Sequence, residues 1–329
     1  MEQIVRASIL GTGSAVPDKV LTNIELEKLV ETTDEWITSR TGIKERRIAV
    51  DGESTSTFAI RAAERALANA GITPDELDLI IVATVTPDFP FPATACLVQN
   101  HLKATRAAAF DVSAACSGFL YGLSLVQNLI KTGSITNALV IGAEVLSRIV
   151  DWSDRSTCCL FGDGAGAVIV GAGAERGMIL STHIHSDGSY WELLHQPACG
   201  SRNPASQKVI DDRLAHIRMQ GNDVFKLAVR AMEEVAHEAL DANGLDISDL
   251  DLLIPHQANR RIIDAIGKRL GLPEEKVFVN VHKYGNTSAA SIPIALEEAN
   301  SLGLLKPGHL VMFDAFGGGL TWASVLVRW

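Results

Sequence analysis

No apolar run in the sequence approaches the ~20 residues that a membrane-spanning helix needs. Residues 1–6 also lack the basic start and the apolar stretch of a secretory signal peptide. We therefore expect a cytoplasmic protein without a membrane partner. The chain contains no low-complexity tract and no interdomain linker, and its 47% hydrophobic and 21% charged residues are typical of a globular protein.

Cysteine is scarce, and basic residues are not in surplus. The five cysteines form an odd number and no two of them have C-x-x-C spacing, which argues against a disulfide framework and against a zinc ribbon. The formal net charge of −10 argues against general affinity for nucleic acid.

The chain is long enough to contain two similar halves. A single hydrophobic core usually stops growing below 329 residues, so two cores or a doubled domain is expected. An internal repeat supports the doubled domain, because an Ala-rich helix, a glycine and a Leu/Ile-rich strand in residues 63–81 recur in residues 236–254, at an offset of 173. We expect an α/β protein with helices on both faces of its sheets. The predicted halves are residues 1–173 and 174–329, which pack together with the active site between them.

Cys116 is the first candidate for chemistry. It lies where an apolar, strand-like run over residues 107–112 gives way to a helix-like run after Gly118. Unpaired N–H groups and the positive end of the helix dipole favour thiolate over thiol at such a place, and the same N–H groups can hold an oxyanion. The alternative for a lone cysteine is a small buried apolar residue.

Two further polar residues occupy comparable positions. His256 and Asn286 each stand where an apolar strand ends and a helix pattern begins. Taken singly, the histidine is equally a helix cap and the asparagine a turn residue. Three such junctions, one with a cysteine, predict one shared pocket.

Several motifs together resemble the β-ketoacyl-acyl-carrier-protein synthase III family. They run through the whole chain, in the order Ile9-Leu-Gly-Thr-Gly-Ser14, Asp34-Glu-Trp-Ile37, Arg40-Thr-Gly-Ile43, Ala115-Cys-Ser-Gly118, Phe161-Gly-Asp-Gly164, Pro255-His-Gln-Ala-Asn259, Gly285-Asn-Thr-Ser-Ala-Ala290 and Phe316-Gly-Gly-Gly-Leu-Thr-Trp322. The resemblance implies a thiolase-like fold, in which duplicated αβαβα halves form a five-layered sandwich. It also implies a homodimer that starts fatty-acid synthesis.

The resemblance implies a role for each candidate residue. Cys116 takes the acyl group of an acyl-coenzyme A primer, and malonyl-acyl-carrier protein then loses carbon dioxide to an enolate that His256 and Asn286 stabilise as hydrogen-bond donors. Backbone N–H groups of Cys116 and Gly319 form the oxyanion hole. Acyl-coenzyme A is a substrate in this scheme, and no cofactor or metal is expected.

The resemblance also suggests where the substrates bind. Thr33 is predicted to cap a helix that carries Trp36 and Arg40 on one face. Trp36 and Arg155 are expected to sandwich the adenine of coenzyme A, with Arg40 on its phosphates. The other assignments are Gln257, Arg261 and Lys226 for carrier-protein docking and Phe91, from the partner subunit, for the primer pocket.

Other functions are left open at this point. The order Cys, His, Asn also occurs in papain-like proteases, and the alternating polar residues of His183-Ile-His-Ser-Asp187 suggest a metal-dependent hydrolase. A related condensing enzyme of specialised metabolism and a non-catalytic carrier-binding protein share the fold. The length and branching of the primer, and whether a carrier protein or free coenzyme A delivers the malonyl group, are not predicted.

Overall fold

Two sheet layers form the frame of the protein in a computed structural model, which describes residues 6–173 and 176–329. Nine strands are hydrogen-bonded in one order, and a single residue pair, Ser8 with Met178, joins the two layers. The first layer runs β5 (Ala108–Val112), β4 (Leu79–Ala83), β6 (Asn137–Val145), β7 (Asp163–Ala172), β1 (Ala7–Ala15). The second runs β8 (Met178–Ser186), β13 (Thr321–Arg328), β12 (Leu310–Gly317), β11 (Leu252–Pro255).

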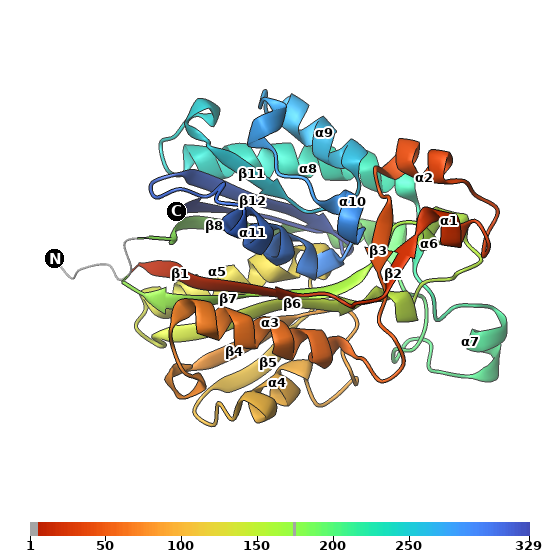
Figure 1. The fold of residues 1–329 in the computed structure, drawn as a ribbon, viewed down its shortest axis with the longest axis horizontal. Helices are drawn as coiled ribbons and strands as arrows, with labels where there is room; N and C mark the ends of the chain where they lie inside the picture. Colours follow the sequence, from red (N-terminus) through yellow and green to blue (C-terminus); the bar gives the residue numbers. More distant parts are fainter. Residues whose placement is uncertain (1–5, 174–175) are drawn as a thin grey trace.

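Helices cover each layer on both faces, as Figure 1 shows. The outer face of the first layer carries α3 (Thr55–Ala70) and α4 (Thr94–Leu102), and that of the second carries α8 (Gly221–Asp241) and α9 (Arg260–Arg269). Between the layers lie α5 (Gly118–Lys131) and α11 (Ser291–Ser301). The predicted five-layered sandwich is confirmed.

The sequence of each helix fits its layer. Central α5 buries large apolar side chains against both sheets, among them Phe119 and Leu123. Outer α3 is amphipathic, and its buried alanines let it lie close to β1. A Cβ atom on Gly13 would lie 2.4 Å from the carbonyl oxygen of Ala62, so this glycine serves close packing of helix on strand.

The internal repeat extends beyond the segment in which the sequence shows it. The offset of 173 residues that relates β4 to β11 also relates α5 to α11 and β6 to β12. The strand register repeats as well, because Leu79 pairs with Ala138 in the first layer and Leu252 with Val311 in the second. The division of the chain at residue 173 stays a prediction.

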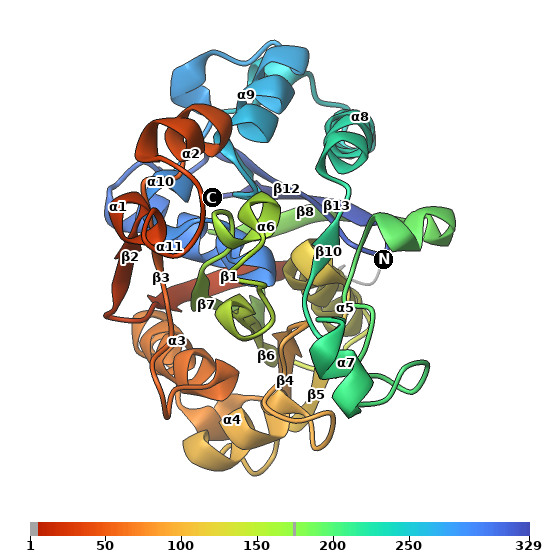
Figure 2. The ribbon, with the colours of Figure 1, turned by 90° about the vertical axis from the view of Figure 1, so that its right-hand side faces the viewer.

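Short elements gather at one end of the molecule, where α5 and α11 begin (Figure 2). They are α1 (Asn23–Leu26), α2 (Asp34–Thr41), α6 (Arg155–Cys158), α7 (Gln207–Asp211), α10 (Val281–Tyr284), β2 (Val20–Thr22), β3 (Glu45–Arg47), β9 (Leu194–His195) and β10 (Arg218–Met219). These segments surround the candidate site. In the described part of the chain, no helix has the length and apolarity that crossing a membrane requires.

Candidate active site

Cys116 lies in a tight 3-10 turn, η2 (Ala115–Ser117), that leads directly into α5. Ala115 adopts a left-handed conformation with φ 44°, which turns the chain sharply between β5 and the helix. Gly317 of β12 packs against the turn, and a Cβ atom there would lie 2.6 Å from the Cys116 nitrogen. The thiol is therefore held at a helix N-terminus, as predicted, with 8% of the residue exposed.

The predicted preference for thiolate needs correction. Burial raises the pKa of Cys116 to about 12, because an anionic sulfur loses its hydration in this pocket. A hydrogen bond from the Ser288 side chain lowers this pKa, and the nearby carboxylate of Glu144 raises it. The resting group is a thiol, so its proton must leave when the sulfur attacks a substrate.

His256 directly follows β11, and its backbone N–H donates to the Asp314 carbonyl oxygen at 2.7 Å. Its imidazole Nδ1 lies 2.6 Å from the hydroxyl oxygen of Ser291 on α11. Burial lowers the pKa of His256 to about 3, so the ring is neutral at physiological pH. It does not cap the next helix, because Asn259 accepts the N–H of Ile262 at the start of α9.

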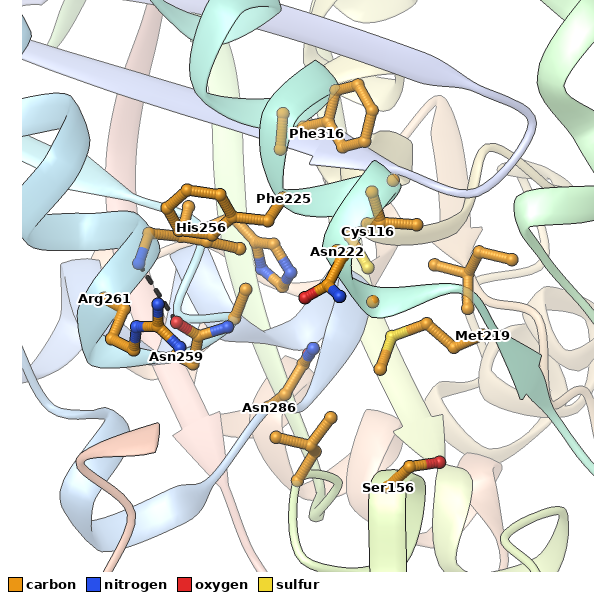
Figure 3. Close-up of a pocket in the computed structure, with 18 of the residues that line it drawn as sticks. Cys116, Ser156, Met219, Asn222, Phe225, His256, Asn259, Arg261, Asn286 and Phe316 are labelled. Atoms are coloured by element: carbon orange, nitrogen blue, oxygen red, sulfur yellow. Dashed lines mark hydrogen bonds between the residues drawn. The ribbon is translucent and has the colours of Figure 1, made fainter. Parts of the chain in front are cut away.

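Asn286 stands in the loop before a second 3-10 turn, η7 (Ser288–Ala290), which leads into α11. Its backbone is fixed between Leu160 and Gly162 by hydrogen bonds of 2.8 and 3.0 Å. Its Oδ1 accepts the Ser288 N–H at 2.8 Å, which identifies the oxygen of the amide and leaves Nδ2 as a donor. In Figure 3, this nitrogen lies at the tip of the side chain.

Cys116, His256 and Asn286 face one cavity of about 670 Å³ (Figure 3). Its lining also includes Phe316, Met219 and the exposed residues Arg40 and Lys226. A smaller cavity of about 310 Å³ reaches Cys116 from another direction, and its wall includes Gly319 and apolar side chains such as Leu146 and Ile149. Cys116 lines both spaces.

Trp36 and Arg40 line the large cavity on α2. Thr33 caps this helix by accepting the Trp36 N–H at 3.1 Å, as predicted. The guanidinium groups of Arg155 and Arg40 lie 4.8 and 5.8 Å from the centre of the indole ring. Arg155 therefore occupies the space over the indole, so an adenine would have to separate the two planes.

The three residues predicted to dock a carrier protein divide into two groups. Lys226 and Arg261 line the large cavity, and the Arg261 guanidinium lies 5.7 Å from the Phe225 ring centre. Gln257 is only 1% exposed; its amide donates to the carbonyls of Pro255 and Phe278, and its oxygen accepts two backbone N–H groups. The docking role of Gln257 stays a prediction, and in the structure its polar atoms hydrogen-bond to loops inside the protein.

Phe91 and the polar run of β8 lie away from the thiol. Phe91 is 85% exposed and lines neither cavity of its own chain. His183 and His185 both contact the Glu238 carboxylate, at 3.1 and 2.6 Å. Residues 6–173 and 176–329 contain no group of three or more His, Cys, Asp or Glu side chains arranged to hold a metal ion.

Sequence reasoning missed Ser291, Ser288 and Glu144. Each interacts with a predicted residue that is distant from it in the sequence, so no local motif predicts the interaction. One signal was available for Ser288, because the repeat offset of 173 aligns it with Ala115, beside the nucleophile.

Comparisons with known proteins agree with this geometry. Residues 110–188 match the family profile of 3-oxoacyl-[acyl-carrier-protein] synthase III, and residues 240–329 match the profile of its C-terminal part. A β-ketoacyl-[acyl-carrier-protein] synthase III from Caldanaerobacter subterraneus subsp. tengcongensis is 54% identical over 325 residues, covering 99% of this chain and 98% of the relative. The crystal structure of the Aquifex aeolicus VF5 enzyme superposes with a TM-score of 0.91 at 54% identity, covering 98% of this chain and 100% of that one.

More distant structures share the fold. A priming β-ketosynthase of the R1128 polyketide pathway is 35% identical, with a TM-score of 0.90, covering 100% of this chain and 98% of that one. Fold and site define a thiolase-fold condensing enzyme, an acyltransferase. Within that class, the chain belongs to the β-ketoacyl-acyl-carrier-protein synthase III family. The papain-like alternative is thereby set aside.

Proposed function

We propose that the protein condenses a short acyl-coenzyme A primer with malonyl-acyl-carrier protein, with loss of carbon dioxide, to begin fatty-acid synthesis. The observation that carries the proposal is the convergence of the Cys116 thiol, the neutral His256 imidazole and the Asn286 amide on one cavity. An enzyme with these substrates acts in the cytoplasm. Its chemistry uses protein side chains and backbone alone, without a metal or cofactor.

In the first half-reaction, Cys116 attacks the thioester carbonyl and coenzyme A leaves. Backbone N–H groups of Cys116 and Gly319 stabilise the tetrahedral oxyanion, and Gly319 supports this role by lining the small cavity beside the thiol. The primer's acyl chain occupies that small, mostly apolar cavity. Its coenzyme A portion runs along the large cavity to Trp36, Arg40 and Arg155.

In the second half-reaction, His256 and Asn286 stabilise the enolate that decarboxylation produces. In this proposal the Ser291 hydroxyl, 2.6 Å from Nδ1 of His256, is the donor, which places the ring's proton on Nε2 and makes it available to the enolate oxygen. The Asn286 Nδ2 supplies the second donor. Because both donors are neutral and fixed, they stabilise the charge without reorganisation, and the carbanion then attacks the acyl-cysteine.

Two parts of the protein surface suit the proposed partners, an acyl-carrier protein and a second copy of the chain. Lys226 and Arg261 at the large cavity would attract an acidic carrier protein. Strand β5 is an edge of the sheet order, and Phe110 on it and Phe91 nearby are 40% and 85% exposed. An unpaired strand edge beside exposed aromatic rings suits a second copy of the chain, whose small cavity Phe91 would shape.

Intact-protein mass spectrometry after incubation with a panel of acyl-coenzyme A thioesters tests the proposal. The parent protein should gain the mass of one acyl group from the preferred primer, and Cys116→Ser should gain none. Cys199→Ser, which removes an exposed thiol, is the matched control and should acylate normally. Undiminished acylation of Cys116→Ser would contradict the assignment. Adding malonyl-acyl-carrier protein or malonyl-coenzyme A then shows which one the acyl-enzyme uses.

A further inference from the structure

A buried carboxylate near the thiol has no part in the reaction described above. Glu144, near the end of β6, is 0% exposed. Its oxygens accept the backbone N–H groups of Val85 and Thr86, both at 3.1 Å, and the hydroxyls of Thr86 at 2.5 Å and Thr84 at 3.2 Å.

The hydrogen bonds show that Glu144 is an acceptor in this state. The Thr86 hydroxyl accepts the Val145 N–H at 2.9 Å, and the Thr84 hydroxyl accepts the Thr86 N–H at 3.0 Å, so each directs its own proton to the carboxylate. Hydrogen bonds from these donors stabilise the ionised form of the carboxyl group. Burial nevertheless raises the pKa of Glu144 to about 7, so the group can take up a proton near neutral pH.

Glu144 faces the turn that holds Ser288. Gly142 and Glu144 lie two residues apart on β6, so they face the same side of the sheet. A Cβ atom on Gly142 would lie 2.0 Å from the carbonyl oxygen of Ala289, so this side of β6 packs against the turn that contains Ser288. Ser288 is 3% exposed and lines the small cavity together with Cys116. Its hydroxyl is within reach of both the thiol and the carboxylate and lowers the pKa of each, and its single proton can be donated to only one of them at a time.

The duplicated architecture shows that this polar pair is not required by the fold. At the offset of 173 residues, Ser288 corresponds to Ala115 and Glu144 corresponds to Gly317. The equivalent positions therefore carry a methyl group, at Ala115 in the first half, and a hydrogen, at Gly317 in the second half, and Gly317 packs directly on Cys116. The Ser288 hydroxyl and the Glu144 carboxylate, which lie near the nucleophile, thus have no polar counterpart at the equivalent positions.

We propose that Ser288 and Glu144 form a proton relay for Cys116. The inference rests on the acylation step of the proposed function. As the sulfur bonds to the thioester carbon, its proton passes to the Ser288 oxygen while the Ser288 proton passes to Glu144; the tetrahedral intermediate then collapses and coenzyme A leaves as a thiolate, which water protonates. After condensation, the Cys116 thiolate is expelled and takes back a proton from Ser288, which recovers one from Glu144.

The relay predicts a particular pH dependence of acylation. Glu144 must be ionised to accept the proton, so the acylation rate should rise as pH increases through about 7. His256, beside the thiol, has a pKa of about 3 and stays neutral over this range. A second histidine, His195, lines the small cavity together with Cys116 and Ser288. The cations Arg40, Lys226 and Arg261 line the same large cavity, outside the small one that Ser288 lines.

Rapid-quench measurement of acyl-enzyme formation between pH 6 and 9 tests the relay. Ser288→Ala and Glu144→Gln should each slow acylation at least tenfold at pH 7.5 and remove the rise near pH 7, leaving a rate that follows hydroxide. The double variant should be no slower than either single variant, because the two residues act as one unit. Decarboxylation of malonyl-acyl-carrier protein should stay within twofold of the parent, which shows that the pocket is intact.

Three outcomes would overturn the relay: variants that keep the parent's rise near pH 7, a loss that is uniform at all pH values, or additive losses in the double variant. Thr86→Val provides a second test if Glu144→Gln does not fold. It removes one donor from the carboxylate, so the rise in the acylation rate should move to higher pH, and an unmoved profile would contradict the relay. If the parent itself forms no acyl-enzyme, the proposed function fails, and the two failures are thus distinguishable.

Discussion

The Nδ1 atom of His256 and the hydroxyl oxygen of Ser291 lie 2.6 Å apart, which joins the end of β11 to the first residue of α11. Asn286 precedes the same helix, so one helix positions both donors of the proposed enolate site. In the proposed mechanism the Ser291 hydroxyl donates to Nδ1 and so determines which imidazole nitrogen carries the proton.

Replacing Ser291 should therefore impair one half-reaction selectively. In Ser291→Ala, the imidazole is free to change tautomer, and we expect malonyl decarboxylation to slow about tenfold, the effect of one hydrogen bond of ~1.4 kcal/mol. Acylation of Cys116 should stay near the parent rate. Ser301→Ala, on the same helix with an exposed hydroxyl bonded to Glu297, is the control. An equal loss in both half-reactions would argue against the tautomer role.

The neutral state of His256 also predicts how stability depends on pH. In the unfolded chain the imidazole titrates near 6.5, whereas in the folded protein burial lowers its pKa to about 3. The unfolded state thus binds a proton that the folded state does not, so stability falls as pH decreases from about 6.5 toward 3. Between pH 7 and 5 this histidine should account for about 2 kcal/mol, and urea unfolding of His256→Asn at fixed protein concentration should show a correspondingly smaller loss.

If the free energy of unfolding of His256→Asn decreases between pH 7 and 5 as steeply as that of the parent, groups other than His256 cause the loss of stability. Glu144 has the opposite sign and does not produce this loss, because its pKa is raised on folding and its carboxyl group favours the folded state when protonated.

The main site residues could be predicted because each follows a local pattern: an apolar strand, a small-residue turn and a helix. That pattern is visible around Cys116, His256 and Asn286 in the sequence alone. It does not show burial, which depends on both sheet layers. For this reason the pKa of the thiol was expected to be low and is raised, and Gln257 was assigned to carrier docking although it is only 1% exposed.

Partners that are distant in the sequence were not predicted. Ser291 reaches His256 across 35 residues, and Glu144 approaches a turn in the opposite half. Both contacts arise from the register and stacking of the two layers. The repeat offset would have aligned Glu144 with Gly317, but only the structure shows that the two positions face the thiol from opposite halves.

Trp36 should contribute to binding of the primer rather than to the chemical steps. Trp36→Ala removes the indole plane that faces Arg155, and we expect KM for acyl-coenzyme A to rise about tenfold with little change in kcat, since stacking on one base contributes roughly 1–3 kcal/mol. Trp191→Ala is a matched control, because the Arg202 guanidinium lies 5.0 Å from that ring and neither cavity includes it. Steady-state kinetics with the identified primer give both parameters, and an effect confined to kcat would contradict the binding role.

Arg261 should affect the carrier-bound substrate more than acyl-coenzyme A. Its guanidinium lies over Phe225 at the large cavity, on an otherwise acidic protein, so charge reversal in Arg261→Glu places a carboxylate where an acidic carrier protein would approach. We expect KM for malonyl-acyl-carrier protein to rise about tenfold at low salt and the difference to shrink as salt screens the charges. Acylation by acyl-coenzyme A should change little. Lys131→Glu, at the far end of α5 from Cys116, makes the same change in net charge and should behave like the parent. If both reversals raise KM equally, the effect comes from net charge and not from a docking site at Arg261.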